Sequence, residues 1–384
     1  MTRGRRARDL RDAARRVTLG AGEIAVGNRR LFLDAVRGVA LVFMVLNHTA
    51  RWWMDGSMGW GRYWLIYATV VLAGPTFLFL VGFSLAVATR AAMTVRGQDF
   101  ATVAKRNLLR GARIIAAGYL LNLVVFPDEP FLSGGVLQTI GLSIVLAIPA
   151  LYLLRYPSAR YVLTALAIVL YVGFVQAFPA LKTWVSAHPI PGLVLFYDFP
   201  IWPWFALVLA GLVLGWTEVR LPDDRARARY YAGFAGAGVV LLVAFVGYHL
   251  STGAPLLHFD QDFTLNHHWT PRSVTLAWIF GWIALQLAVA YYLIEVKRFP
   301  ARVLVLLGQT ALMLYFLHQI VVYTIVKNWL GLVFNHWWLY AVANAVLLLG
   351  LVLLAAAWQR LRPFMPWARG RKLMPTAPPA PVLR

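Results

Sequence analysis

Ten apolar segments, each 18 residues or longer, run through this 384-residue sequence and limit what it can fold into. A helix of about 20 apolar residues crosses the hydrocarbon core of a bilayer, which is roughly 30 Å thick. Segments of this kind satisfy their backbone polar groups inside a membrane only as α-helices. The sequence therefore predicts an all-α integral membrane protein, a polytopic bundle of about ten transmembrane helices. The predicted spans are residues 31–54, 64–90, 106–126, 134–154, 159–178, 200–217, 230–250, 273–296, 301–326 and 338–359.

The composition agrees with a membrane protein. Charged residues make up 13% of the chain and hydrophobic residues 60%, whereas a soluble domain carries about 25% charged residues. A soluble enzyme and a disordered chain are therefore excluded. The absence of cysteine from the sequence excludes a thiol nucleophile and a thiolate metal site. The adjacent His267 and His268 lack the spacing of a metal-ligand set, so no metal site is expected.

The basic residues predict the orientation of the chain in the membrane. Lys and Arg number 36 against 15 Asp and Glu, a net charge of +21. When the N-terminus is placed inside, 30 basic residues fall on the cytoplasmic side and only 5 in outer loops, which is the bias of the positive-inside rule. Both termini are therefore predicted to be cytoplasmic, and a nucleic-acid partner is not expected. Arginine outnumbers lysine 31 to 5, as in GC-rich bacterial genomes, so the expected location is a bacterial cytoplasmic (inner) membrane.

The same pattern divides the chain into three parts. Residues 1–30 are predicted to form a basic cytoplasmic tail, residues 31–361 the transmembrane domain, and residues 362–384 a cytoplasmic tail rich in Pro and Arg. Membrane lipids are expected partners. The oligomeric state is left open, a homodimer included.

The first span holds the densest set of polar residues: Asp34, Arg37, Asn47 and His48. Ionisable groups inside a membrane are costly, and their default interpretation is functional. Arg37 and His48 fall on one stripe of the helix, which must face the bundle or a water-filled cavity. Asp34 and Arg37 are three residues apart and can form an ion pair. Histidine suits proton transfer near neutral pH, and asparagine can stabilise an oxyanion.

The ninth span offers a partner for His48, because Tyr315, His318 and Gln319 share one face of it. His318 and His48 each lie 17 residues from the start of their spans, or roughly 25 Å from the cytoplasmic ends. At this matched depth both histidines can line one chamber near the outer surface. The alternative is that either one only bonds to a neighbouring helix.

Two further groups of residues are candidates for ligand binding. Arg106, Arg110 and Arg113 share one helix face with Lys105 beside them, near a helix N-terminus that favours anions. They either contact acidic lipids, which the spacing alone favours, or bind the phosphates of a cytoplasmic cofactor. Asp198 and Trp204 lie at the outer end of the sixth span. Asp198 can orient an acceptor amine or hydroxyl, or cap the helix.

Five motifs, in order along residues 30–325, resemble the heparan-α-glucosaminide N-acetyltransferase-like family of transmembrane acyltransferases, as a bacterial member. They are Arg30-Leu31-Phe32-Leu33-Asp34 through Arg37-Gly38, Met44 and Asn47-His48; Gly74-Pro75-Thr76-Phe77 through Val81-Gly82; Gly135-Val136-Leu137-Gln138; Pro200-Ile201-Trp202-Pro203-Trp204 through Gly211 and Gly215; and Leu307-Gly308 through Tyr315 and His318.

The resemblance implies that acetyl-CoA binds from the cytoplasm and that its acetyl group reaches an amino sugar on the far side. Asn47 matches a family asparagine at the reaction centre. Human-type members carry their catalytic histidine in the outer loop after the first span, but residues 54–63 contain no histidine. His48 resembles instead the histidine that bacterial relatives place inside this span. The first span is also similar to that of bacterial O-acyltransferases that modify envelope polysaccharides.

The expected function is transfer of an acetyl or similar acyl group from CoA to an amine or hydroxyl of an envelope glycan or glycolipid. His48 is the expected general base, or alternatively a transient acyl carrier, and Asn47 the oxyanion donor. Asp34 and Arg37 are expected to set the geometry of the cytoplasmic half. In this interpretation the four basic residues bind CoA phosphates, and the acceptor side is lined by Tyr315, His318, Gln319, Asp198 and Trp204.

Two other classes stay open. In a proton-coupled transporter or flippase, Asp34, Arg37 and His48 would form a proton or substrate pathway. The sequence shows no pair of interrupted helices or inverted repeats of the kind that transporters use. In a scaffold, the polar residues would only hold the helices together.

Overall fold

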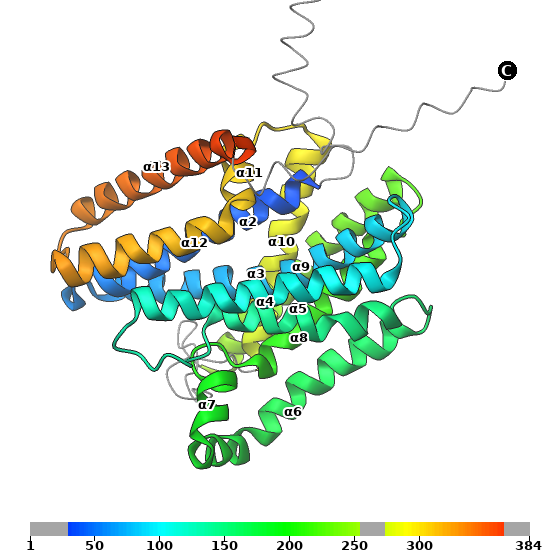
Figure 1. Cartoon of the computed structure of the whole chain (residues 1–384), viewed down its shortest axis with the longest axis horizontal. Coiled ribbons are helices and arrows are strands. Elements are labelled where there is room, and N and C mark those ends of the chain that lie inside the picture. The colour runs from blue at the N-terminus through cyan, green and yellow to red at the C-terminus, as the bar shows by residue number, and fades with distance from the viewer. Residues whose placement is uncertain (1–29, 254–272, 365–384) are drawn as a thin grey trace, which may run out of the picture.

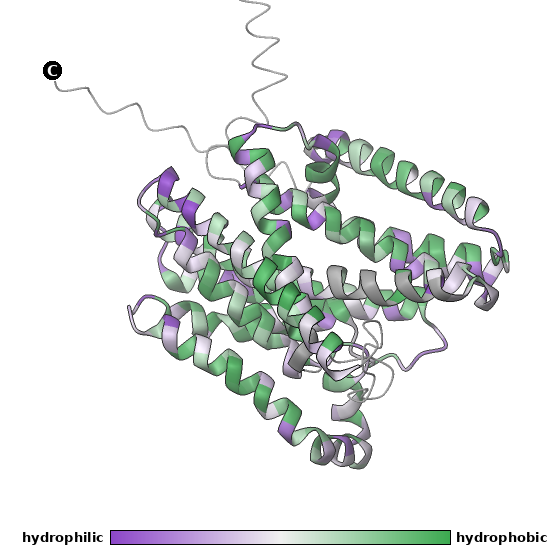
Figure 2. Cartoon of the chain, turned by 180° about the vertical axis from the view of Figure 1, so that it is seen from behind, coloured by the Kyte–Doolittle hydropathy of each residue, from purple (hydrophilic) through white to green (hydrophobic). Residues whose placement is uncertain are grey.

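The computed structural model describes residues 30–253 and 273–364 (Figure 1). Within these residues it contains ten helices that are long and apolar enough to cross a membrane. The predicted all-α, polytopic fold is confirmed. Figure 2 shows hydrophobic residues along most of each helix and hydrophilic residues mainly at helix ends and in turns. Residues 1–29 and 365–384, which make up most of the two predicted tails, lie outside the described residues, as do His267 and His268.

The helices follow one another through short connections. They are α2 (Leu31–Trp53), α3 (Gly59–Thr94), α4 (Phe100–Val125), α5 (Val136–Leu153), α6 (Ala159–Ala187), α7 (Pro189–Phe196), α8 (Ile201–Glu218), α9 (Asp224–Thr252), α10 (Ser273–Ala290), α11 (Arg302–Gln309), α12 (Ala311–Gln319) and α13 (Trp337–Leu361). Two π-helical segments, η3 (Tyr291–Val296) and η4 (Ile320–Trp329), continue α10 and α12.

The structure differs from the predicted spans in two places. Residues 179–199, predicted as an outer loop, are mostly helical, because α6 runs through Pro179 to Ala187 and the short α7 follows it. The ninth predicted span is interrupted at Thr310, where α11 ends and α12 begins. The Thr310 hydroxyl donates to the carbonyls of Leu306 (2.8 Å) and Leu307 (3.3 Å), a local bond that competes with regular helix geometry.

Glycines allow α3 and α8 to pack backbone against backbone. A Cβ at Gly211 or Gly215 of α8 would overlap the carbonyl oxygens of Phe79 or Phe83 in α3. Gly82 of α3 is equally close to Val208 of α8. Small residues at helix interfaces permit this approach in membranes. Since α3 also packs against α2, it joins α2 to the half of the bundle that contains α8.

A second pair of glycines brings α11 against α2. A Cβ at Gly38 would overlap the backbone of Leu304, and one at Gly308 would overlap the backbone of Asp34. Figure 1 shows α2, α11, α12 and α13 together on one side of the molecule. The close α2–α11 contact places α12, which follows α11 directly, beside the distal half of α2.

Candidate active site

His48 of α2 and His318 of α12 are in direct contact. Their Nδ1 and Nε2 atoms, respectively, are 2.8 Å apart. The two rings are nearly coplanar, with an interplanar angle of 2° and centroids 5.1 Å apart. The centroid distance exceeds the nitrogen–nitrogen distance by about one ring width, so the rings meet edge to edge. This is the geometry of an in-plane hydrogen bond along which a proton can be held or moved.

The surroundings of His318 determine which nitrogen carries each proton. His318 is fully buried, and its Nδ1 lies 2.9 Å from the Leu314 carbonyl oxygen. A carbonyl only accepts, so His318 Nδ1–H donates to it, and Nε2 of the neutral ring is an acceptor. His48 Nδ1–H then donates to His318 Nε2. His48 Nε2 therefore carries the lone pair and is the basic nitrogen of the pair.

Gln319 completes the contact with His48. Its side-chain amide lies 3.0 Å from His48 Nδ1, and the residue is 2% exposed. An amide can present oxygen to the Nδ1–H form of His48, or nitrogen when Nδ1 is an acceptor. Gln319 also hydrogen bonds to Tyr315, whose ring meets His318 edge-on at 5.6 Å. Three of the residues predicted to line the acceptor side, Tyr315, His318 and Gln319, thus surround His48.

Aromatic residues that sequence reasoning missed lie next to this pair. Trp52 stacks on His48 with ring centroids 5.1 Å apart, and its ring also meets Tyr323 of η4 at 5.0 Å. Phe126, at the end of α4, lies 4.7 Å from Tyr323. The Lys327 ammonium is 4.1 Å from the Tyr323 ring centroid. These half-buried side chains form an aromatic rim beside His48.

A period of four residues could have revealed part of this rim. Gln319, Tyr323 and Lys327 follow one another at this spacing. In an α-helix such a row drifts around the axis, but the i→i+5 bonds of a π-helix widen each turn and bring the row back over itself. Segment η4 therefore keeps these side chains on the face toward α2. Trp53 Nε1 fixes that segment to α2 by donating to the Val322 carbonyl at 2.9 Å.

Asp34 and Arg37 form the predicted ion pair, but far from His48. Arg37 Nη1 is 2.5 Å from Asp34 Oδ1, and Arg37 Nη2 donates to the Ser84 hydroxyl of α3. Gln309 of α11 donates to the other Asp34 oxygen at 3.4 Å. Eleven residues of helix separate Arg37 from His48, or roughly 16 Å. The pair ties α2 to α3 and α11 and is not part of the histidine cluster.

Asn47 faces α3. It is 4% exposed, and its Nδ2 donates to the Ile66 carbonyl. This bond uses one of the two amide protons, so donation to an oxyanion would fall to the second one. That role stays a prediction.

The other predicted binding residues lie apart from the histidines. Lys105, Arg106, Arg110 and Arg113 are all exposed on the face of α4 opposite its buried residues, and Arg106 donates to Gln98 at 3.0 Å. Trp204 of α8 is buried against Phe199. Asp198 does not cap α8, because the N-cap is Pro200 without a side-chain bond, so that alternative was wrong. Its charge acts on the Tyr315 hydroxyl, which places Asp198 on the His318 side.

The family model described as "Heparan-alpha-glucosaminide N-acetyltransferase, catalytic" matches residues 29–250, more than half of the chain. The chain belongs to this family. It is thus a member of a transmembrane acetyltransferase family, as the sequence motifs indicated. No curated protein in the comparison matches the chain.

The matched region of this acetyltransferase family covers α2 to α9 and contains His48, Asn47, the Asp34–Arg37 pair and the basic face of α4. It ends before α12, so His318 lies outside it. The family in general uses acetyl-CoA as its donor. In the described part of the chain, no group of three or more His, Cys, Asp or Glu side chains could hold a metal ion.

A buried carboxylate also escaped the sequence analysis. Glu218, the last residue of α8, is 0% exposed and pairs with Arg30 (3.3 Å) and Arg227 (3.0 Å). Arg30 precedes α2, and Arg227 belongs to α9, so one carboxylate joins three helices at their basic ends. Such a triad has no sequence signal, because its members lie nearly two hundred residues apart in the chain. It is a structural tie.

Proposed function

We propose that this protein moves an acetyl or similar acyl group from acyl-CoA on the cytoplasmic side to an amine or hydroxyl of a glycan or glycolipid on the outer side. Family membership supports the acetyl transfer. The observation that carries the site assignment is the in-plane hydrogen bond between His48 and His318. The predicted orientation of the chain places this pair in the outer half of the membrane.

His48 Nε2 is the general base in this proposal. As the acceptor nitrogen or oxygen attacks the thioester carbonyl, His48 Nε2 takes the acceptor's proton and the ring becomes an imidazolium. His318 Nε2 holds the Nδ1–H of that imidazolium, and the Leu314 carbonyl holds His318 in the matching tautomer. When the tetrahedral intermediate collapses, His48 returns the proton to the leaving CoA sulfur. The second amide proton of Asn47 is the candidate oxyanion donor.

A covalent route is the alternative within the same reaction. In it, His48 Nε2 attacks the thioester and carries the acyl group before the acceptor arrives. Rapid mixing of the protein with labelled acetyl-CoA, without acceptor, separates the two routes. Label that stays on wild-type protein after acid quenching and is absent from His48→Ala supports the carrier. The base mechanism predicts no such label.

The donor is expected to bind through Lys105, Arg106, Arg110 and Arg113. Their exposure on α4 leaves them accessible to the phosphates of CoA. The test is thermal unfolding of the detergent-purified protein with acetyl-CoA, with ADP as the control ligand. A ligand at one hundred times its dissociation constant stabilises the folded state by about 2.7 kcal/mol.

The stabilisation by acetyl-CoA is expected to fall in Arg106→Ala/Arg110→Ala. It is expected to persist in Arg225→Ala/Arg229→Ala, a matched change at two exposed arginines of α9. His48→Ala should bind acetyl-CoA normally but lose transfer. Full transfer by folded His48→Ala would refute the base assignment.

A proton-coupled transporter or flippase is the second candidate, because the interruption at Thr310 divides a predicted span beside the ionisable residues of α2. The two functions differ in their need for acyl-CoA. No thermal shift with millimolar acetyl-CoA, from protein shown to be folded, would favour the transporter.

The proposed orientation can be tested directly, because the chain has no native cysteine. A membrane-impermeant maleimide should label Ser57→Cys in intact bacterial cells and Ser158→Cys only after permeabilisation. Both serines are exposed and lie at opposite ends of the bundle. The reverse pattern would invert the proposed topology.

A further inference from the structure

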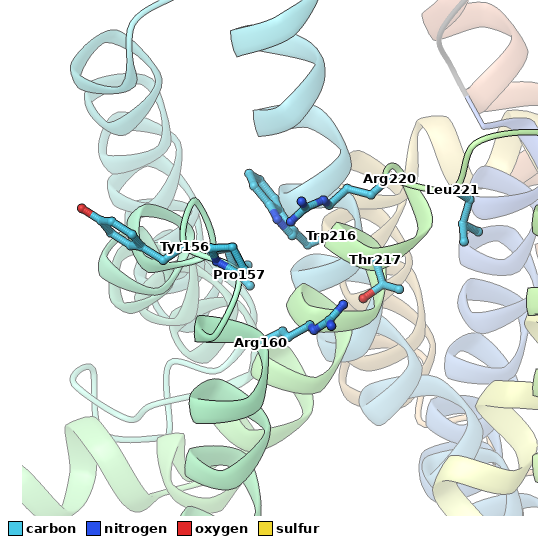
Figure 3. A pocket seen from close by; sticks show the side chains of 8 residues that line it. Tyr156, Pro157, Arg160, Trp216, Thr217, Arg220 and Leu221 are labelled. Atoms are coloured by element: carbon cyan, nitrogen blue, oxygen red, sulfur yellow. The ribbon is translucent and has the colours of Figure 1, made fainter.

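A small cavity lies between the turn that connects α5 to α6 and the end of α8. Its volume is about 270 Å³, and its lining includes Tyr156, Arg160, Trp216, Thr217 and Arg220. In Figure 3 the Arg160 guanidinium points toward Thr217, and Arg220 lies beside the Trp216 ring. We call this cavity the head pocket. It lies at the end of the bundle that the charge pattern predicts to be cytoplasmic.

The chemistry of the head pocket suits a phosphate group. Trp216 is 4% exposed, and its indole Nε1–H has no hydrogen-bond partner among the described residues. A buried donor without an acceptor is uncommon in folded proteins, and an indole nitrogen can only donate. Arg160 and Arg220 add two guanidinium groups, which bind phosphate oxygens in a bidentate manner. Donors and positive charge therefore converge on one small space.

A second, apolar cavity continues along the same two helices. It has a volume of about 410 Å³ and is lined by α6, α8 and α10. On α6 its lining begins at Thr164, one turn after Arg160. On α8 it ends at Leu214, one turn before Thr217. Residues spaced by three or four share one helix face, so both cavities lie on the same faces of α6 and α8. We call this second cavity the apolar groove.

We propose that the head pocket and the apolar groove together bind an anionic phospholipid. The phosphate group lies between Arg160, Arg220 and the Trp216 indole, and an acyl chain follows the groove between α6 and α8. A phosphate-binding pocket joined end to end with a hydrocarbon-lined groove matches the two parts of such a lipid. Basic pockets between transmembrane helices on the cytoplasmic side bind acidic headgroups in this way. This proposal does not depend on the acyltransfer proposed above.

The test is native mass spectrometry of the delipidated, detergent-purified protein titrated with dioleoyl phosphatidylglycerol or dioleoyl phosphatidylcholine. We expect wild-type protein to retain one phosphatidylglycerol under conditions that remove phosphatidylcholine. Arg160→Ala/Arg220→Ala should lower the affinity for phosphatidylglycerol at least tenfold. Trp216→Phe, which keeps a ring but removes the donor, should lower it several-fold. Arg225→Ala/Arg229→Ala has the same change of charge on α9 and should bind as wild type does.

A variant in the groove tests the chain-binding half separately. Ala210 lines the apolar groove, so Ala210→Phe should fill it and weaken phosphatidylglycerol binding while both arginines stay in place. Equal retention of the two lipids, or equal affinities in the pocket and control variants, would overturn the proposal. Displacement of the lipid by CoA would assign the head pocket to the donor instead. Displacement by a polyprenyl phosphate at lower concentration would assign it to a lipid-linked substrate.

Discussion

Gly308→Ala tests whether the close packing of α2 and α11 positions the histidine pair. A Cβ at Gly308 would overlap the Asp34 carbonyl oxygen and carbon. The overlapping atoms belong to the backbone, so rotation of a side chain cannot relieve the contact. The two helices must move apart, and α12 moves with α11. His318 is then drawn away from His48, which it now contacts at 2.8 Å.

The expected loss of stability follows from two opposing terms. Overpacking costs about 1–3 kcal/mol. Replacing Gly with Ala inside a helix returns about 0.5–1 kcal/mol. Because the overlap is with backbone, the upper part of the overpacking range applies, and Gly308→Ala should lower the free energy of unfolding by about 2 kcal/mol. A displacement of about 1 Å at a catalytic group can lower the rate roughly a hundredfold.

The matched control is Gly350→Ala in α13, where an added Cβ meets nothing within 4 Å. It has the same change of side chain and the same gain in helix propensity, but no overlap. Thermal unfolding and acetyl transfer should be measured on both variants. We expect Gly350→Ala to melt at or above the wild-type temperature with normal activity. If Gly308→Ala matched it in both measurements, the argument that α2–α11 packing positions His318 would be wrong.

Three further predictions concern buried polar groups. His318→Gln keeps an acceptor near the Nε2 position and should retain more activity than His318→Leu, which should lower kcat about 10- to 100-fold with an unchanged KM for acetyl-CoA; equal kcat values would contradict the positioning role. Arg37→Gln leaves the buried Asp34 carboxylate without its cation and should destabilise the protein by about 3–5 kcal/mol, whereas Arg37→Gln combined with Asp34→Asn should recover much of this in thermal unfolding; no recovery would contradict the pairing argument. Thr49→Val removes a hydroxyl that lies 2.8 Å from Asn344 Oδ1 and should cost about 1–3 kcal/mol, with Thr164→Val, at an exposed threonine, as the unaffected control.

Much of the fold could be predicted from the lengths of the apolar segments. The first span, predicted as 31–54, is α2 (Leu31–Trp53), because a stretch of apolar residues between polar ends can adopt only one structure in a bilayer. The spacing of Gly211 and Gly215 also predicts close helix packing, which the structure shows against α3. The helical content of residues 179–199 could not be predicted. Its prolines suggested a loop, although proline is tolerated at Pro179 inside α6 and at the start of α7.

The site was predictable in composition but not in geometry. Helical periodicity and depth identified His48 and His318 as candidates for one chamber. Neither could show that the rings meet in one plane, because this depends on how α11 packs against α2 and where the chain bends at Thr310. The Trp52–Tyr323 contact and the Arg30–Glu218–Arg227 triad were missed for a similar reason. Contacts between residues distant in sequence leave no periodic pattern in a single chain.

The sequence by itself determined the all-α membrane architecture, the family and the residues that are costly to place in lipid. These properties depend on local quantities: segment length, hydropathy, charge and short motifs. Only the tertiary structure decided which of the polar residues act together. It joined His48 to His318 and Gln319, and it separated Asp34 and Arg37 from them by roughly 16 Å of helix. Hydrophobicity selects which segments enter the membrane, whereas the backbone contacts that glycine permits determine which faces of those segments meet.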